Sequence, residues 1–367
     1  MRVRLEDVCE KESSKLKQSD VIDQNGMYPV YGASGYLGNI NTYQQSNYYV
    51  AVVKDGAGIG RTMLLPPKSS IIGTMQYLIP KDNVQPEYLY YVVKAKHLEK
   101  YFSGATIPHI YFKDYKNEQF DLVSFEEQRD IINRLRKIEK VIDNLSKNLL
   151  LLDELVKARF VEMFGDPRIN DKKWKTGKIV DYFEVKGGKR IPKGMGYAER
   201  KTNHPYLRAS DMKNATILDD DIHYIDEEVY KRIKRYTVNA HDIYLTNVGV
   251  NLGMAGVIPK KYDGANLTEN AVKLVPKDKI LLNGMFLSYY INSPGIQHYI
   301  NERKMSVGVP KLAIFRIESM PLLLPPLELQ NQFASFVKQI DKSRSRIQKS
   351  LEASQELFDS LMQEYFG

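Results

Sequence analysis

The sequence predicts an α+β protein in which two mixed sheet-and-helix domains are joined by two long helices that pair with each other. Three observations predict this class: an internal repeat, an apolar heptad pattern in both copies of that repeat, and short apolar segments separated by turn residues. The boundaries that follow are residues 1–123 and 167–325 for the domains, and 124–166 and 326–367 for the long helices.

The internal repeat is the firmest of these observations. Residues 124–165 lie on residues 326–367 without a gap, at a constant offset of 202. Matched positions include Glu126 with Glu328, Gln128 with Gln330, Leu155 with Leu357 and Phe164 with Phe366. Looser matches begin with residues 28–34 and 204–210, and their offset drifts from 176 to 202. That drift indicates two copies of one fold with loop insertions of different length. Residues 87–101 and 283–301 are predicted to form one helix in each copy.

Apolar residues in both long segments recur at alternating spacings of four and three, the pattern of a coiled-coil seam. Arg344 and Ser354 interrupt the second seam, and polar seam positions fix register, which favours pairing of these two unequal helices over two homodimers. The alternative is that both are ordinary helices packed on their own domain cores. The predicted seam comprises Ile131, Leu135, Ile138, Ile142, Leu145, Leu149 and Leu152, followed by Val337, Ile340, Ile347, Leu351 and Phe358.

Composition limits the location and the partners of the chain. The 367 residues carry a formal net charge of +8, which favours a polyanionic partner without establishing one. The single cysteine, Cys9, cannot form an internal disulfide, and no basic-then-apolar signal segment precedes the polar start. Apolar runs fall far short of the roughly 20 residues that cross a bilayer. We therefore expect a cytoplasmic protein without a membrane partner.

Several phrases of the sequence mark the ends of the long helices and the segment before the second one. They are Pro-Pro-Leu-Glu-Leu-Gln at 325–330, Ser-Phe-Glu-Glu-Gln at 124–128, the endings Met-Phe-Gly-Asp-Pro and Tyr-Phe-Gly, and Gly-Val-Pro-Lys-Leu at 308–312. With these phrases, the order of domain, long helix, domain and long helix resembles the DNA-specificity subunits of type I restriction-modification enzymes, which take part in defence against foreign DNA. The resemblance covers the whole chain.

The resemblance implies two target-recognition domains, each reading one half of a split, asymmetric site on double-stranded DNA. It also implies that the long helices pair as an antiparallel coiled coil. The expected partners are modification subunits, which bind S-adenosylmethionine and methylate adenine, and restriction subunits, which use ATP and magnesium to translocate DNA before cutting. We expect no catalytic residue, metal or cofactor in this chain.

The sequence agrees with that expectation, because motifs for such chemistry are missing. It has no Asn-Pro-Pro-aromatic or Asp-Pro-Pro-aromatic stretch for amine methylation and no Gly-x4-Gly-Lys-Ser/Thr loop for ATP. Its six histidines have no metal-ligand spacing. The glycine-rich residues 56–60 fit a turn between strands better than a phosphate site, because the next segment reads as a strand.

Polar and basic side chains on loops are the candidates for DNA contact, because phosphates position a protein while base edges are read by such groups. Residues 186–193 are the most attractive stretch, since paired glycines let backbone amides and basic side chains approach a phosphate together. A solvated basic loop is the alternative. The predicted contacts are Lys54, Arg61, Gln76, His109 and Lys113 in the first domain, and Lys186, Lys189, Arg190, Lys193, Arg208, Asn247, Asn251, Lys304 and Lys311 in the second.

Two rival functions remain open at this stage. One is a stand-alone DNA-binding regulator or a phage restriction antagonist built on the same scaffold. The other is a small-molecule enzyme that uses residues 56–60 as its phosphate site.

Overall fold

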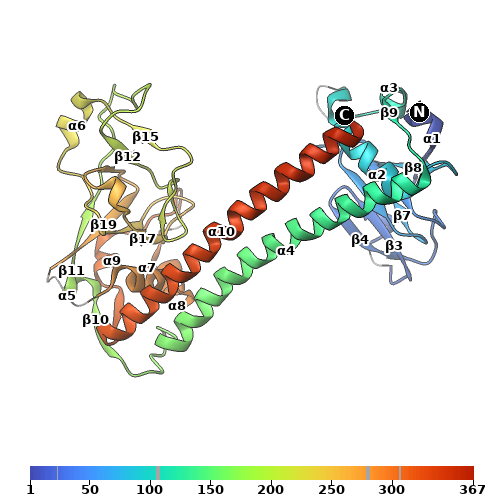
Figure 1. Cartoon of the computed structure of the whole chain (residues 1–367). Coiled ribbons are helices and arrows are strands. Elements are labelled where there is room, and N and C mark those ends of the chain that lie inside the picture. Colours follow the sequence, from blue (N-terminus) through green and yellow to red (C-terminus); the bar gives the residue numbers. More distant parts are fainter. Residues whose placement is uncertain (23, 105–107, 278–281, 306) are drawn as a thin grey trace. The chain divides into compact units, whose positions relative to one another are not determined.

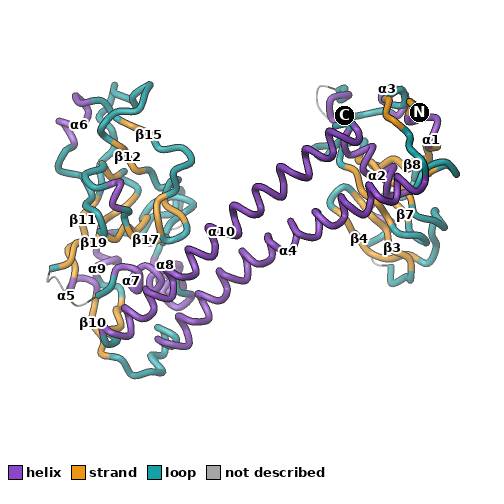
Figure 2. Tube along the Cα trace, viewed as in Figure 1, coloured by secondary structure: helices purple, strands orange, loops and turns teal. Residues whose placement is uncertain are grey.

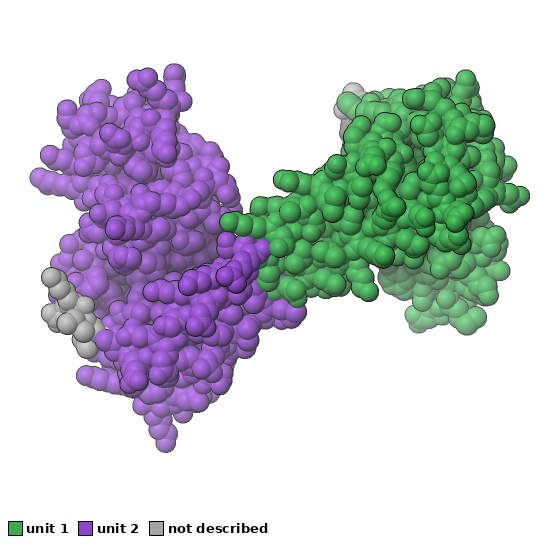
Figure 3. Space-filling model, in the orientation of Figure 1, with its two compact units in different colours: residues 1–148, 347–367 green, residues 149–346 purple. Residues whose placement is uncertain are grey.

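The computed structural model describes residues 1–22, 24–104, 108–277, 282–305 and 307–367. The chain forms two compact units, which are coloured separately in Figure 3. Unit 1 comprises residues 1–148 and 347–367, and unit 2 comprises residues 149–346. The two long helices are therefore shared, because each begins in one unit and ends in the other.

The described residues of unit 1 form two small sheets, a helix that packs on one of them, and a strand pair that joins the beginning of the chain to the segment before the first long helix (Figure 1). β2, β8, β5 and β6 form an antiparallel four-stranded sheet in that order, and β4, β3 and β7 form a second sheet in which β3 and β7 are parallel. β1 pairs with β9. In chain order the elements are β1 (Arg2–Arg4), α1 (Leu5–Val8), β2 (Cys9–Ser13), β3 (Tyr28–Gly32), β4 (Gly35–Ile40), β5 (Tyr49–Val53), β6 (Thr62–Leu65), β7 (Ser70–Ile71), β8 (Met75–Pro80), α2 (Pro86–Ala95), α3 (Phe112–Tyr115) and β9 (Gln119–Asp121).

Strand β5 lies at the centre of unit 1, and all five of its residues are buried. Successive side chains of a strand point to opposite faces of the sheet. Val50 and Val52 pack in the apolar cluster that contains α2, whereas Tyr49 and Ala51 pack in the cluster that contains Ile71 of β7. The four-stranded sheet therefore lies between α2 and the second sheet, which explains the continuous apolar run of β5.

Unit 2 repeats this order of elements. Its sheets have the orders β11-β19-β16-β17 and β15-β12-β18, and β10 pairs with β20 as β1 pairs with β9. The β13–β14 hairpin and α6 precede β16 and lie where the sequence offset changes from 176 to 193. The elements are β10 (Lys175–Lys178), α5 (Ile179–Tyr182), β11 (Phe183–Gly187), β12 (Pro205–Leu207), β13 (Met212–Lys213), β14 (Thr216–Ile217), β15 (His223–Tyr224), α6 (Glu227–Ile233), β16 (Ile243–Thr246), β17 (Ala255–Val257), β18 (Asn266–Leu267), β19 (Ala271–Pro276), α7 (Gly284–Asn292), α8 (Pro294–Arg303), α9 (Ile314–Glu318) and β20 (Pro321–Leu324).

The two long helices are α4 (Phe125–Phe164) and α10 (Leu327–Phe366), each 40 residues and so about 60 Å long. The hydroxyl oxygen of Ser124 accepts a hydrogen bond from the backbone N–H of Glu127 at 3.3 Å, which caps the start of α4. Gly165 follows its end with φ +78°, the left-handed conformation that terminates many helices.

The long helices run antiparallel within each unit. In unit 1, Ile131 and Leu135 near the start of α4 share an apolar cluster with Phe358 near the end of α10. In unit 2 the ring of Phe160, near the end of α4, lies 5.4 Å from the ring of Phe333, near the start of α10. Figure 2 shows both helices as continuous. The predicted class, mixed domains joined by an antiparallel helical pair, is confirmed.

All twelve predicted seam residues are buried or half-buried. The two polar interruptions of the second seam differ in their contacts. Arg344 forms an ion pair across the helices with Asp153, with Nη2 and Oδ1 2.6 Å apart. Ser354 donates instead to the backbone carbonyl of Ser350 within α10. Arg344 therefore makes the kind of cross-helix polar contact that fixes register.

Two shorter helices differ from the sequence prediction. A helix is predicted over 87–101, but α2 ends at Ala95 and His97 adopts φ +48° before a short 3-10 turn. A single helix is predicted over 283–301, but the structure has α7 and α8. They are separate because Ser293 is extended before Pro294, whose ring disfavours helical geometry in the preceding residue.

A buried glutamine at the start of each long helix ties that helix to its neighbouring domain. Gln128 is 0% exposed, and its Oε1 accepts a hydrogen bond from the backbone N–H of Gln85 at 2.9 Å, at the start of α2. Its Nε2 donates to two backbone carbonyls. Gln330 occupies the repeated position and accepts from the N–H of Asn283 at 2.8 Å, at the start of α7. The repeat therefore preserves a contact as well as a pattern.

We expect Gln128→Ala to lower the free energy of unfolding of unit 1 by about 2–4 kcal/mol. The substitution removes three partly buried hydrogen bonds, each contributing about 0.5–1.5 kcal/mol. Denaturant unfolding of the full chain measures the change. Glu126→Ala, at an exposed position two residues earlier, is the matched control and should change stability by no more than about 0.5 kcal/mol. Equal losses in both variants would contradict the assignment.

Candidate nucleic-acid interface

Two loops meet in unit 1. The first, residues 54–61, connects β5 to β6, and the second, residues 108–113, leads into α3. The backbone N–H of Gly56 donates to the carbonyl of Pro108 at 3.0 Å, and His109 forms a backbone bridge to the first loop. These two loops are termed the unit 1 junction.

Unit 2 has the same arrangement, termed the unit 2 junction. Residues 247–254 connect β16 to β17 and meet residues 307–312. The N–H of Gly249 donates to the carbonyl of Pro310 at 2.9 Å, and Lys311 bridges to the first loop. The sequence offsets are 193 for the first loop and 202 for the second, so the two junctions are copies of one structure.

Equivalent positions in the two junctions carry different side chains. In unit 1, Nδ1 of His109 lies 2.7 Å from Oδ1 of Asp55. In unit 2, Lys311 takes the place of His109 and is exposed, and Val248 takes the place of Asp55. The same backbone arrangement thus carries a histidine–carboxylate pair in unit 1 and a lysine beside an apolar residue in unit 2.

The other predicted contacts of unit 1 surround its junction. Arg61 is exposed, and its Nη1 donates to the carbonyl of Ala33 at 2.7 Å. Lys113 is exposed, with its Nζ 5.3 Å from the centre of the Tyr111 ring. Lys54 is half-buried at the start of the first loop. The junction therefore brings together four of the five residues predicted for the first domain.

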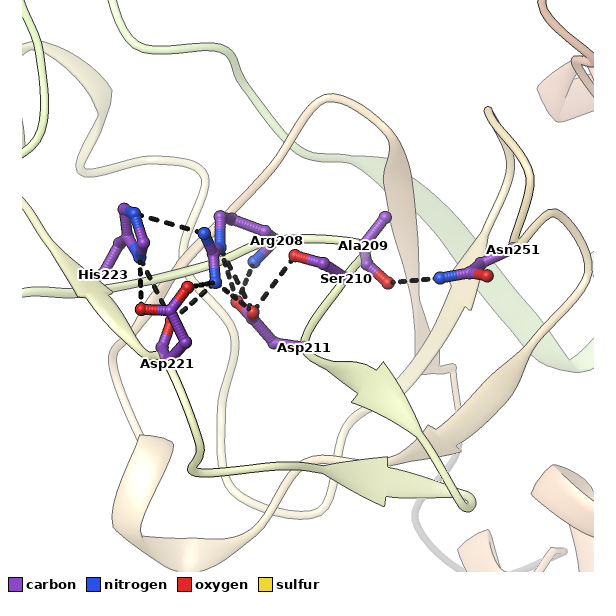
Figure 4. Close-up of polar contacts among 7 residues, drawn as sticks. All are labelled: Arg208, Ala209, Ser210, Asp211, Asp221, His223 and Asn251. Carbon is purple, nitrogen blue, oxygen red and sulfur yellow. Dashed lines mark hydrogen bonds and ion pairs between the residues drawn. The ribbon is translucent and has the colours of Figure 1, made fainter. Parts of the chain in front are cut away.

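Arg208 of unit 2 is the centre of a polar network (Figure 4). Asp211 accepts hydrogen bonds from its Nη2 at 2.7 Å and from its Nε at 3.1 Å. Asp221 accepts from Nη2 at 3.0 Å, and Nη1 lies 3.2 Å from Nε2 of His223. The hydrogen bonds to Asp211 raise the pKa of Arg208 further above its ordinary value. A DNA contact would therefore require this guanidinium to leave partners within the protein.

Asn251 connects the unit 2 junction to the segment that carries this network. Its Nδ2 donates to the carbonyl of Ala209 at 3.4 Å (Figure 4). Ala33, which accepts from Arg61 in unit 1, is the repeat equivalent of Ala209. In each unit, a polar side chain of the junction therefore donates to the equivalent Ala-Ser segment of that unit. The side chain is Arg61 in unit 1 and Asn251 in unit 2.

The basic residues around β11 lie outside the unit 2 junction. Lys186 forms an ion pair with Glu184 at 2.5 Å, and both side chains are exposed. Nζ of Lys189 lies 5.8 Å from the centre of the Tyr236 ring. These contacts are at the surface, so they contribute little to stability and leave both cations close to solvent.

The segment after β11 forms one wall of a surface hollow of about 510 Å³. Arg190, Lys193 and Arg208 line it together with Tyr197. Nε of Arg190 is 2.5 Å from a carboxylate oxygen of Glu269, while Lys193 is exposed. The hollow combines cations with an aromatic ring, a combination that suits contact with a nucleic acid.

Three more of the predicted DNA-contact residues are buried or half-buried and form hydrogen bonds within the protein. Gln76 lies in β8 rather than on a loop, is 6% exposed, and donates to a backbone carbonyl of β2. Asn247 is also buried, and its Nδ2 donates to the carbonyl of Leu312 at 3.4 Å. Lys304 is half-buried and donates to Oδ1 of Asn301 at 2.8 Å. Burial separates Gln76 and Asn247 from the exposed members of the predicted set.

Sequence reasoning missed the exposed aromatic and apolar side chains of the junctions. Tyr111 is about half exposed in unit 1, and Val250 and Val307 are almost completely exposed in unit 2. Each valine lies next to a glycine with positive φ, Gly249 or Gly308. A glycine next to an apolar residue in a predicted turn is the sequence signal that could have identified these valines as exposed.

The described part of the chain holds no cluster of three or more histidine, cysteine, aspartate or glutamate side chains that could bind a metal ion. Among the same residues, no helix combines the length and apolar character needed to span a bilayer.

Comparison with known proteins identifies the family. Residues 1–152 and 171–355 match the model of the type I restriction modification DNA specificity domain. The MjaIX specificity subunit of a type I restriction enzyme from Methanocaldococcus jannaschii is 24% identical over 306 residues, covering 78% of this chain and 69% of the relative. The MjaVIII specificity subunit from the same organism is 22% identical over 327 residues, covering 82% and 76%.

The fold has a solved counterpart. The S subunit of a type I restriction-modification system from M. genitalium aligns over 100% of this chain and 96% of its own, with a TM-score of 0.63 and 17% sequence identity. At this identity the likeness establishes the fold alone.

We expect Lys311→Ala to weaken binding of the full chain to nonspecific duplex DNA. Loss of one phosphate contact should also reduce the slope of log affinity against log salt concentration by about one. A salt titration with one nonspecific duplex measures both quantities. Lys342→Ala, at an exposed position of α10, is the control and should leave the slope unchanged. Identical slopes in the Lys311 variant and the wild type would refute the phosphate contact.

Proposed function

The chain belongs to the type I restriction modification DNA specificity family, and from that premise we propose how it works. It is a non-catalytic subunit that reads a bipartite, asymmetric DNA site and leaves methylation and cleavage to partner subunits. Each unit reads one half of the site through its junction.

The two junctions carry this proposal, because they share a backbone and differ in chemistry. His109 is replaced by Lys311, and Arg61 is replaced by Met254, at matching positions. Base edges are distinguished by the donors, acceptors and apolar groups that face them. Two junctions with different side chains would therefore select two different half-sites, which makes the whole site asymmetric.

The net charge of +8 and the exposed cations near the junctions supply the sequence-independent part of DNA binding. Histidine, arginine and lysine at the junctions are side chains that make both phosphate and base contacts. Phosphate contacts that give affinity and base contacts that give specificity are what a DNA-recognition subunit requires.

Partner docking is proposed on the long helices of unit 2. Leu150 and Leu151 of α4 are more than half exposed, and Leu155 lines a surface hollow of about 580 Å³ with Phe336 of α10. Exposed apolar side chains that gather on a helical surface suit a protein partner. We assign this surface to a modification subunit, which would bring S-adenosylmethionine, while a restriction subunit would bring ATP and magnesium.

Co-expression with candidate modification subunits, followed by genome-wide mapping of methylated adenines, tests the proposal. A gapped motif with two unlike halves is the expected result, and it should vanish when either protein is omitted. The chain could instead bind DNA while no adenine is methylated after co-expression with each modification subunit encoded in the source genome. That result would favour a stand-alone regulator or a restriction antagonist.

The length of the helical pair should set the number of unread base pairs between the half-sites. Inserting one heptad after Lys147 and one after Lys349 lengthens both helices at matched positions and retains the seam. Seven residues add about 10 Å, which corresponds to a gap longer by about three base pairs. Methylation mapping measures the gap. A heptad inserted into α4 alone should instead destabilise the helical pair, and an unchanged gap in the doubly extended chain would contradict this role.

A further inference from the structure

Two valines of the unit 2 junction are exposed to an unusual degree. Val250 is 98% exposed and Val307 is 97% exposed, and Val309 beside them is 65% exposed. A scattered apolar residue at a surface needs no explanation, but three on two joined loops form a group.

Hydrogen bonds between backbone groups hold the loops that carry these valines. Besides the bond from Gly249 to Pro310, the N–H of Leu312 donates to the carbonyl of Asn247 at 2.8 Å. The loops turn at Gly249 and Gly308, whose φ values are +100° and +80°. A Cβ atom added to either glycine would have no neighbour within 4 Å, so both turns are open to an approaching surface.

The electrostatic setting of the valines suits a polyanion. Residues 243–262 contain no aspartate or glutamate, and neither do residues 303–317. Lys311 lies within the same junction and is exposed. An apolar group beside a cation, on loops that themselves carry no carboxylate, suits a DNA groove, where phosphates flank the base edges.

Thymine offers an apolar group at a base edge, because its C5-methyl group lies in the major groove. We propose that Val250 and Val307 contact thymine C5-methyl groups in the half-site that unit 2 reads. The inference rests on the proposed DNA-reading function and adds residues that determine its specificity. Ala57 is the repeat equivalent of Val250, so unit 1 has a smaller apolar side chain at this point.

Deoxyuridine substitution tests the proposal, because uracil pairs as thymine does but lacks the methyl group. The full chain, purified with its modification subunits, is titrated with duplexes that contain the mapped site and one deoxyuridine in place of each thymine in turn. We expect at least one position in one half-site to lose about threefold to fivefold in affinity, the effect of leaving one methyl group unburied.

The variants Val250→Thr and Val307→Thr keep the branched shape of the side chain and replace a methyl group with a hydroxyl. Together they should remove the difference between thymine and uracil at that position. Val180→Thr is the matched control, because Val180 is a partly exposed valine of unit 2 outside the junction. It should retain the full difference.

The possible failures are distinguishable. Specific binding that is indifferent to deoxyuridine at every thymine overturns the methyl contact and leaves the proposed function standing. The same conclusion follows if both variants retain the wild-type difference, or if neither half-site contains an A·T pair. Apolar insertion between base pairs, which does not depend on the methyl group, would give the first of these results. Absence of any sequence-specific binding would instead reject the proposed function itself.

Discussion

The aromatic end of each long helix is buried in the unit where the other long helix begins, and the architecture of both units depends on this exchange. Phe366 packs 5.3 Å from the Tyr88 ring in unit 1, and Phe164 packs 4.6 Å from the Phe286 ring in unit 2. Burial of a phenylalanine contributes about 1.5–3 kcal/mol, and a favourable aromatic pair adds about 0.5–1.5 kcal/mol. Lys96 donates to the carbonyl of Phe366 at 2.5 Å, and burial lowers the pKa of its ammonium group. Neither unit is therefore complete without the helix that the other unit starts.

Structural features that depend on regular spacing in the sequence could be predicted, whereas isolated contacts could not. The long helices were predictable because their apolar spacing and their repeat offset extend over about forty residues, and local exceptions such as Arg344 do not disturb such a pattern. The role of Gln128 was visible only as a match with Gln330, because its partners are backbone groups far along the chain. Gln76 and Arg208 were predicted as exposed contacts because residue type does not reveal burial or an existing carboxylate partner.

Duplication explains why one chain can present two surfaces of different chemistry without two different folds. The helix-to-sheet packing around β5 uses side chains that are fully buried, so substitutions there carry the cost of cavities or overpacking. The junction side chains are mostly exposed, and substitutions at exposed positions usually change stability by less than about 0.5 kcal/mol. His109 and Lys311 could therefore diverge while their surroundings remained alike.

The way the junctions are held together adds a second reason for this freedom. In both units the two loops are joined by hydrogen bonds between backbone groups, from Gly56 to Pro108 and from Gly249 to Pro310. Such bonds do not depend on side-chain identity, so a residue of the loop can change without releasing its backbone. A surface positioned in this way presents each new side chain from a fixed place, which limits the conformational entropy lost on binding. Val250 and Val307 can accordingly remain exposed on the loops, because their backbone is fixed by groups that neither side chain supplies.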